Sequence, residues 1–560
     1  METRRKIFLA IIIYGISIAQ VFMNDIVIFK CSKKLEDELN KIDKKDFLNY
    51  KELYLELQRI SYKYKKELTS ADKLELTKRF LLIGYLTDAE KLCNETLTQC
   101  TPESLEDLPI KYVGLFYISH IASQCANHDI ARKIFFKILA VIPEFLAGIL
   151  WHYLFIMSYD IRMNGRKQRS LSEYSIRQYK TRRYSRPKAK PLDGRPLRVG
   201  YVSGDFKIHP VGLLIYGVIG SHNKDRIETF AYSTIKKTDD SITKVIAENC
   251  FFQDVSQLND DDFEDKIRED NIDILVDLSG YTDGGRLSVF VREPAPCMIS
   301  WLGYWATTGI RTMDAVILDH WHAPENEGYE KAFSEPIYRL PCARFCFRPA
   351  KNTPDLSPCP PVLEKGYITF GCFNNTMKYS GSMLRAWAEI LQRVPDSRLI
   401  LKWQTFHDEH MCDRVRRSFQ ALGVNPKRIE FRGMSSYIDM LKEYGEIDIA
   451  LDTFPFSGGI TTCNALWQGV PLVTLEGDRV CGRQGHAILN AIDLPDFSAR
   501  NVEHYINIAC GLAENKVLLS VLRASMRYRM ATSSFLNVAS FTQHLEQAFF
   551  AIYKKRLAQE

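Results

Sequence analysis

The segment 451–467 carries the residue types most suited to holding a phosphate. A hydrophobic run ends at Asp452, a glycine pair at 458–459 turns the chain, and Thr461 and Thr462 open a helix-like stretch. Free amide groups and two hydroxyls at the start of a helix suit a phosphate, although a helix cap and a tight turn use the same residue types. The pattern is neither a P-loop nor a GxGxxG fingerprint, which argues against nucleotide hydrolysis and dinucleotide binding.

Three other polar side chains lie in loops that follow strand-like runs. Lys378 comes just after one such run, where a lysine can neutralise a diphosphate; a solvated loop lysine is the alternative. His209 precedes Pro210, a residue favoured at the first position of a helix, so His209 would lie at the helix cap and face a cleft. A structural histidine is the alternative there. Arg483 is either a phosphate partner or an ordinary surface arginine.

Strand-like runs alternate with helical stretches from residue 197 onward. They fall into two sets, separated by a proline-rich stretch at 354–361, and the runs are 197–203, 272–278, 298–302, 315–318, 367–373, 398–402, 428–431, 447–451 and 471–474. Alternation of this kind predicts parallel sheets. We therefore expect one α/β lobe over 197–360 and a second, with C-terminal helices, over 361–560. A ligand would bind in the cleft between them.

The first part of the chain, 1–160, reads as helical. Small residues at Gly84 and Ala89 match Ala126 and Ala131, as in two degenerate copies of a tetratricopeptide-type hairpin. Their offset of 42 residues exceeds the usual period of about 34, and an irregular helical bundle is the alternative. Residues 162–190 hold eleven basic side chains and one acidic one. We expect 161–196 to be a solvated basic linker; nucleic-acid or acidic-lipid binding is the alternative.

Composition limits the class of protein. The 560 residues are 46% hydrophobic and 25% charged, the balance of a globular protein, which argues against a disordered chain, a fibre or a multi-span membrane protein. A net charge of +6 is too small to indicate a nucleic-acid partner. The closest of the 14 cysteines, Cys342 and Cys346, lack a second pair that would complete a zinc site. The apolar run 7–23 is expected to be a core helix, with membrane contact as the alternative.

Seven motifs in a fixed order resemble the catalytic region of the O-linked N-acetylglucosamine transferases and their plant SPINDLY-type and bacterial homologues. The motifs are Gly200–Phe206 with His209-Pro210, Asp277–Gly280, Pro294–Pro296, Trp301–Tyr304, Phe373–Asn375 with Lys378, Asp452–Pro455, and Thr461–Cys463. The resemblance runs from about Arg198 to Gln547. It implies a GT-B fold of two Rossmann-like lobes, here preceded by an all-α, degenerate tetratricopeptide-like domain.

The resemblance also implies a set of site residues. Lys378 would contact the diphosphate of a nucleotide sugar and be needed for catalysis, and the helix start at Ile460, Thr461 and Thr462 would hold phosphate. His209 would lie near the reacting centre. No metal ion or other cofactor is implied, and the sequence offers no DxD motif at a strand end to hold one.

Five positions bear on the choice of donor and acceptor. Asn375 stands where animal enzymes have Gln and is expected to take part in donor recognition, and Gly459 stands where they have His. Asn464 replaces a carboxylate expected to meet the donor ribose, and Met440 replaces a histidine near the uracil. Tyr281 replaces a histidine common in bacterial homologues and is assigned to the acceptor side.

The expected reaction is inverting, metal-independent transfer of GlcNAc from UDP-GlcNAc to Ser or Thr hydroxyls of a protein, possible acceptors being a flagellin or a surface adhesin. The alternatives are a GDP-fucose donor, as in SPINDLY-type relatives, an asparagine or non-protein acceptor, and a non-catalytic peptide-binding scaffold. Nucleotide sugars are made in the cytosol, so we expect a cytoplasmic protein.

Overall fold

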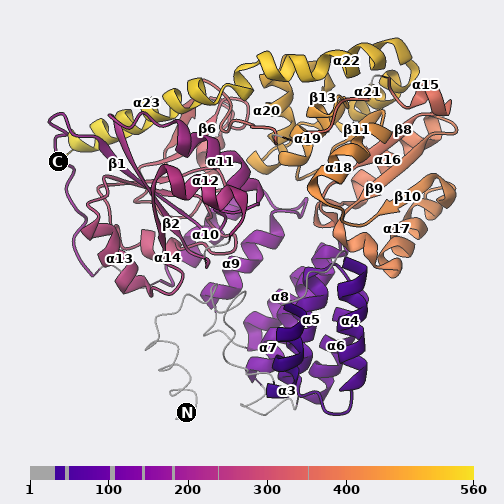
Figure 1. Ribbon diagram of the computed structural model, residues 1–560, viewed down its shortest axis with the longest axis horizontal. Helices are drawn as coiled ribbons and strands as arrows, with labels where there is room; N and C mark the ends of the chain where they lie inside the picture. Colours follow the sequence, from indigo (N-terminus) through magenta and orange to yellow (C-terminus); the bar gives the residue numbers. More distant parts are fainter. Residues whose placement is uncertain are drawn as a thin grey trace.

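The structure is a computed structural model that describes residues 32–43, 50–100, 108–141, 146–179, 183–236, 239–350, 352–357 and 359–559. It has two α/β lobes side by side, with a helical region against both (Figure 1). The apolar run 7–23 lies outside the described residues. Among the described helices, no single one is long and apolar enough to cross a membrane, although α21 (Val502–Glu514) and α22 (Lys516–Thr532), which meet at 94°, pass that test as a pair.

The N-terminal lobe is built on a seven-stranded parallel sheet of order β3-β2-β1-β4-β5-β6-β7. Its strands are β1 Leu197–Ser203, β2 Ile227–Ser233, β3 Phe251–Asp254, β4 Ile274–Asp277, β5 Cys297–Ser300, β6 Ala315–Asp319 and β7 Ile337–Leu340. Strands β4 and β5 are buried along their whole length, as expected when helices cover both faces of a parallel sheet. The helices of this lobe are α11 Pro210–Ser221, α12 Ser241–Asn249, α13 Asp260–Glu269 and α14 Leu287–Phe290.

The C-terminal lobe repeats the same topology with six parallel strands of order β10-β9-β8-β11-β12-β13. Its strands are β8 Thr369–Cys372, β9 Arg398–Lys402, β10 Ile429–Arg432, β11 Ile449–Leu451, β12 Leu472–Leu475 and β13 Ser498–Ala499. Its helices include α15 Val362–Lys365, α16 Gly381–Arg393, α17 Glu409–Ala421, α18 Tyr437–Glu443, α19 Ile460–Trp467 and α20 Gln484–Ala491. The last helix, α23 (Val538–Leu557), returns across the molecule and packs on α11 of the first lobe (Figure 1). The prediction of two Rossmann-like lobes in a GT-B arrangement is confirmed.

The helical region consists of paired antiparallel helices. They are α3 Lys33–Asp43, α4 Tyr50–Lys63, α5 Ser70–Leu82, α6 Leu86–Gln99, α7 Leu108–Gln124, α8 His128–Val141 and α9 Leu146–Met157. In the α5–α6 and α7–α8 hairpins, Gly84 and Ala126 both adopt positive φ after the first helix, and Ala89 and Ala131 are fully buried where the helices meet. The two hairpins therefore have equivalent turns, as their sequences indicate, while their description as tetratricopeptide repeats stays a prediction.

Segment 161–196 was predicted to be a solvated linker. Its first half instead contains a helix, and its second half contains an arginine that is buried in ion pairs. Residues Gly165–Ile176 form helix α10, which buries Gln168 against the N-terminal lobe, where its amide donates to the Tyr304 hydroxyl at 3.0 Å. Downstream, Arg186 is 9% exposed and forms ion pairs with Glu293 and Asp314. The acidic partners that neutralise these basic side chains come from distant parts of the sequence, which is why local composition indicated an exposed segment.

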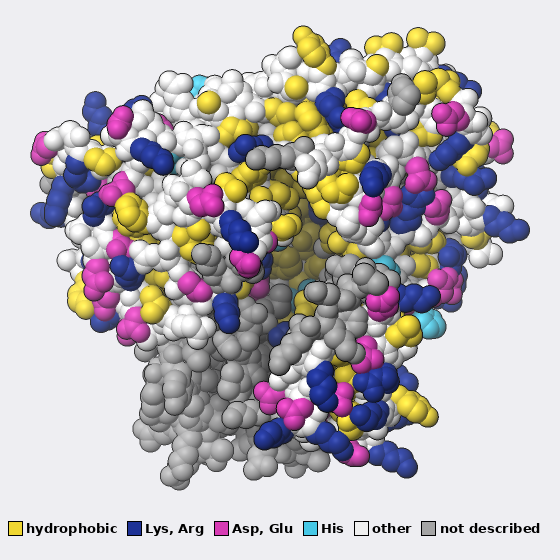
Figure 2. All heavy atoms as spheres, viewed as in Figure 1, with side chains coloured by type: hydrophobic (Ala, Val, Ile, Leu, Met, Phe, Trp, Pro, Cys, Tyr) yellow, Lys and Arg dark blue, Asp and Glu magenta, His cyan; other side chains and the backbone are white. Residues whose placement is uncertain are grey.

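The helical region contacts both lobes. On one side, the backbone amide of Thr87 donates to Asp408 Oδ2 at 2.7 Å, and a Cβ atom on Gly84 would overlap the carbonyl oxygen of Gln404. On the other side, Trp151 of α9 packs edge-on against Tyr281 of the N-terminal lobe at 5.0 Å. Figure 2 shows a recess with hydrophobic side chains near the centre of one face, where the lobes approach the helical region.

Candidate active site

A buried carboxylate shapes the loop that follows β11. Asp452 Oδ1 accepts hydrogen bonds from the amides of Thr453 at 2.9 Å and Gly458 at 2.7 Å, and its Oδ2 accepts from the Thr474 hydroxyl at 2.7 Å. Burial raises the pKa of Asp452, and these donors oppose that shift. A Cβ on Gly485 would collide with Asp452 and Thr474, which explains the glycine at that position. The loop is thus held in one shape from both ends.

This loop presents the N-terminus of α19. Gly459 is the N-cap residue, and no side chain caps the helix. A Cβ on Gly458 would lie 2.5 Å from Thr462 Oγ1 and 2.7 Å from Thr461 Oγ1, so both hydroxyls lie over this glycine. The Thr462 hydroxyl is buried and has no hydrogen-bond partner within the described part of the chain. Uncapped amides and hydroxyls at a helix start form a site for an anion.

Lys378 points at the same helix start. It ends a short 3-10 turn, Thr376–Lys378, after β8. Its Nζ donates to Asn374 Oδ1 at 3.1 Å and to the carbonyl oxygen of Ser457 at 2.9 Å. Desolvation lowers the pKa of Lys378 to about 8, against the opposing attraction of Asp452. The Lys378 amine is therefore still mostly protonated at neutral pH, and its positive charge can bind a nearby anion.

Asn374 joins the two halves of this site, and sequence reasoning missed it. Its Oδ1 accepts from Lys378 and, at 2.9 Å, from Thr461 Oγ1. The neighbouring Asn375, which was expected to meet the donor, caps the 3-10 turn by accepting from the Met377 amide at 2.9 Å. Both asparagines lie in one motif, but only the folded chain shows which of them faces α19.

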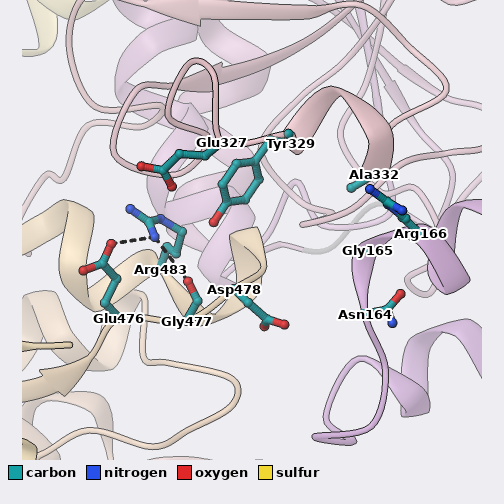
Figure 3. A pocket seen from close by; sticks show the side chains of 11 residues that line it. Asn164, Gly165, Arg166, Glu327, Tyr329, Ala332, Glu476, Gly477, Asp478 and Arg483 are labelled. Atoms are coloured by element: carbon teal, nitrogen blue, oxygen red, sulfur yellow. Dashed lines mark hydrogen bonds and ion pairs between the residues drawn. The ribbon is translucent and has the colours of Figure 1, made fainter. Parts of the chain in front are cut away.

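Asn464 and Arg483 are both engaged by protein groups. Asn464 Oδ1 accepts from the Tyr437 hydroxyl at 2.9 Å, which adds Tyr437 of α18 to the site. Arg483 is 4% exposed, donates to the carbonyl oxygen of Trp321 at 2.6 Å and pairs with Glu476 at 2.7 Å. Figure 3 shows this arginine lining a pocket of about 650 Å³ to which both lobes contribute. Arg483 thus joins the two lobes, and its role as a phosphate partner stays a prediction.

His209 lies at the carboxyl end of β1 and caps α11, as expected. Its Nδ1 accepts from the Val211 amide at 3.4 Å and lies 3.3 Å from Asp205 Oδ2. Desolvation and the nearby Lys207 lower the pKa of His209, so the ring is neutral near pH 7. Burial raises the pKa of Asp205 to about 6. Nε2 makes no hydrogen bond within the described residues, and because Nδ1 accepts from the amide, a neutral ring carries its hydrogen on Nε2 and can donate from there.

Tyr281 is a buried structural residue. It is 1% exposed, and its hydroxyl donates to the carbonyl oxygens of Thr308 at 2.7 Å and Ser172 at 3.2 Å. It borders a pocket of about 520 Å³ that the helical region shares with both lobes. The lining of this pocket includes Lys78, Phe116, His152, Asp283 and Gln404. Tyr281 thus fixes α10 on the lobe and forms part of the pocket wall, while its acceptor role stays a prediction.

Among the described residues, no group of three or more His, Cys, Asp or Glu side chains could hold a metal ion. The absence of a metal or other cofactor from the reaction stays a prediction.

Comparisons with known proteins identify the family of this chain. A family model described as glycosyl transferase family 41 matches residues 151–349 and 362–545. The probable UDP-N-acetylglucosamine–peptide N-acetylglucosaminyltransferase SPINDLY of Solanum lycopersicum is 35% identical over 370 residues, 64% of this chain and 39% of its own. SEC of Arabidopsis thaliana, named for the same activity, is 30% identical over 64% of this chain and 37% of its own. The chain therefore spans about two fifths of the length of these curated relatives.

A solved structure resembles nearly the whole molecule. A Lys-to-Met mutant of the O-GlcNAc transferase of Thermobaculum terrenum superposes with a TM-score of 0.83 at 28% identity, covering 94% of this chain and 98% of that one. The likeness includes the helical region as well as both lobes. The chain belongs to glycosyl transferase family 41.

Proposed function

We propose that this protein transfers GlcNAc from UDP-GlcNAc to Ser or Thr hydroxyls of protein acceptors, with inversion and without a metal ion. The observation that carries the proposal is the convergence of Lys378 Nζ and Thr461 Oγ1 on one oxygen of Asn374 at the uncapped start of α19. Two donors that meet on one neutral oxygen can turn to a diphosphate without large movement. The activities for which SPINDLY and SEC are named support the same reaction class.

In the proposed reaction, the acceptor oxygen bonds to the anomeric carbon as the bond to the diphosphate oxygen breaks. Negative charge grows on the departing diphosphate, so donors fixed at that position stabilise the transition state more than the ground state. Lys378, Thr461, Thr462 and the α19 amides would supply them. His209 would orient the acceptor hydroxyl or relay its proton, with Asp205 beside Nδ1.

The acceptor would enter through the 520 Å³ pocket beside the helical region. This pocket borders the loop at 281–283 that follows β4, on the lobe that carries His209. We place the protein in the cytoplasm, where nucleotide sugars are made, and propose a flagellin or surface adhesin as the acceptor class.

A second candidate donor differs from UDP-GlcNAc in its nucleotide base. Asn464 is an amide already engaged by Tyr437, and it stands where a carboxylate would meet the ribose of UDP. Because UDP and GDP carry the same ribose, this position does not select the base, and GDP-fucose is kept as the alternative donor from the resemblance to SPINDLY-type relatives. Calorimetry with UDP and with GDP separates the two, because tighter binding of GDP would overturn the choice of UDP.

The reaction itself is tested by co-expression with candidate surface proteins, followed by intact mass measurement. A mass increase of one N-acetylhexosamine per site on Ser or Thr is expected, and site mapping by peptide mass spectrometry would distinguish an asparagine acceptor. If the protein binds neither UDP nor GDP and no acceptor changes in mass, the scaffold alternative is favoured and the proposal is overturned.

A further inference from the structure

The ring of Phe456 lies directly against the ammonium of Lys378. The distance from Nζ to the ring centroid is 4.7 Å, and Phe456 is 4% exposed. We propose that Phe456, held in place by Tyr159 and Trp305, is a positioning residue that keeps the Lys378 ammonium charged and aimed at the donor site. The proposal rests on the proposed function only in taking Lys378 as the partner of the donor diphosphate.

Three separate parts of the chain hold this ring. Tyr159, which follows α9, stacks on Phe456 with centroids 4.9 Å apart and planes 24° apart. Trp305, in the N-terminal lobe after β5, meets it edge-on at 4.6 Å and 81°. Stacked and edge-on pairs are the favoured geometries of aromatic side chains. The ring is thus fixed from the helical region and from the opposite lobe, while its own loop belongs to the C-terminal lobe.

The ring faces an ammonium whose charge is disfavoured by desolvation. A cation over an aromatic face is attracted by the ring quadrupole, more strongly where water is excluded. The titratable groups that face Lys378 are Asp452, Cys372 and Cys481. Asp452 is already occupied by two amides and the Thr474 hydroxyl. Among the described residues, the ammonium directly contacts two neutral oxygens and the ring, so removal of the ring takes away one of these three contacts.

The contact also links the donor site to the arrangement of the lobes. Met377, Phe456 and Cys481 of the C-terminal lobe share one hydrophobic core with residues of α7 to α9. A shift of the helical region or of Trp305 would therefore change the position of the Phe456 ring relative to the Lys378 ammonium. This coupling gives Tyr159 a role in the reaction although it belongs to neither lobe.

The direct test is a titration of Lys378 by NMR of protein labelled with ε-13C lysine. The resonance is assigned by its loss in Lys378→Arg. In Phe456→Leu the pKa of Lys378 should fall by about half a unit, since an ion–ring contact contributes about 0.5–1 kcal/mol and one pKa unit corresponds to about 1.4 kcal/mol. Tyr159→Phe, which keeps the stack, should leave the pKa unchanged, and Tyr159→Leu should lower it.

The matched control is Phe431→Leu. Phe431 lies under the guanidinium of Arg416 at 5.0 Å on β10 of the same lobe, so this variant removes a similar ring away from Lys378. An unchanged Lys378 pKa in Phe456→Leu, or an equal fall in Phe431→Leu, would overturn the proposal. If Phe456→Leu does not fold, Phe456→Met, with an unbranched side chain that fills irregular space, replaces it.

Measurements of turnover distinguish failure of the proposed function from failure of the proposed role of Phe456. With UDP-GlcNAc as donor, activity should be lost at high pH as Lys378 deprotonates, and Phe456→Leu should move that loss to lower pH. Absence of turnover with any nucleotide sugar would defeat the proposed function alone, because the NMR titration uses the free protein and decides the role of Phe456 independently.

Discussion

Replacing Lys378 with methionine is expected to abolish most activity and to make the free protein more stable. Methionine keeps much of the length of the side chain but removes the charge. Loss of one preorganised donor at the leaving group should lower the rate on the order of 10²–10³-fold. The stability gain follows from the depressed pKa of Lys378, because the folded protein holds a charged group where burial disfavours it.

The size of the gain can be worked out from the shift. Desolvation lowers the pKa of Lys378 from 10.5 to about 8, so the charged form is disfavoured by up to ~3.4 kcal/mol at about 1.36 kcal/mol per pKa unit. The side chain is only partly buried, and the variant loses two hydrogen bonds, each contributing about 1 kcal/mol. We expect a net gain of about 1 kcal/mol at pH 7.

The pH dependence of this gain has a definite sign. The penalty is fully present below pH 8, where Lys378 is charged in both the folded and unfolded states. It is relieved as the pH rises from about 8 toward 10.5, because the folded protein then binds fewer protons than the unfolded chain. The advantage of Lys378→Met should therefore shrink between pH 7 and pH 9.5.

Both effects are measured on the same preparations, by UDP release from UDP-GlcNAc and by thermal unfolding at the two pH values. Lys402→Met is the matched control, because Lys402 is another buried lysine of this lobe and pairs with Glu443 at 2.9 Å. It should lower the melting temperature and leave turnover of the folded protein intact. Near-normal turnover in Lys378→Met would remove Lys378 from the mechanism, and a fall in its melting temperature as large as that of the control would refute the desolvation argument.

Three further outcomes are expected. Gly458→Ala should displace the two threonine hydroxyls above it and raise the donor KM by about tenfold, the equivalent of about 1.4 kcal/mol, whereas Gly511→Ala, where a Cβ meets open space, should leave the KM unchanged in the same assay. Activity should fall as the pH drops through about 6, where Asp205 becomes protonated, and a pH–rate profile of Asp205→Asn should lack that fall; its persistence would assign it to another group. Arg186→Gln should lower the free energy of unfolding in urea by about 3 kcal/mol, since it removes the cation that pairs with Glu293 and Asp314, with Lys188→Gln as the control, and equal effects of the two would contradict this account of segment 161–196.

The sequence predicted strands with continuous apolar runs better than strands that contain polar or exposed residues. Strands β1 and β9 have the bounds predicted from their hydrophobic runs, 197–203 and 398–402. Four strands were missed: the interior strand β2, in which Glu228 and Thr229 interrupt the apolar residues, and the edge strands β3, β7 and β13. Of these, β3 is largely exposed, β7 contains Arg339 and β13 has only two residues. Pattern alone identifies a strand only where burial demands continuous apolar residues.

In the candidate site, residues specified by the local sequence could be predicted, whereas residues specified by distant contacts could not. Lys378, Thr461 and the helix start could be predicted, because each is specified by a short motif next to a strand end. Asn374 and Phe456 could not be assigned their roles, since these depend on contacts between residues about 80 positions apart. The contact of Arg483 with the carbonyl oxygen of Trp321 could not be predicted for the same reason, because this acceptor lies on the other lobe.

The boundary between the helical region and the catalytic part also differs from what composition indicated. The family match begins at residue 151, within α9 and well before β1. The structure gives the physical reason: the carbonyl oxygen of Asp160, just after α9, accepts a hydrogen bond from buried Arg479 at 3.2 Å, and Tyr159 stacks on Phe456. The segment after α9 therefore packs against the loops that hold Lys378, and a protein cut at residue 197 would expose the apolar side of the donor site. In physical terms, the part of the chain that the family model matches starts in the last helix of the helical region.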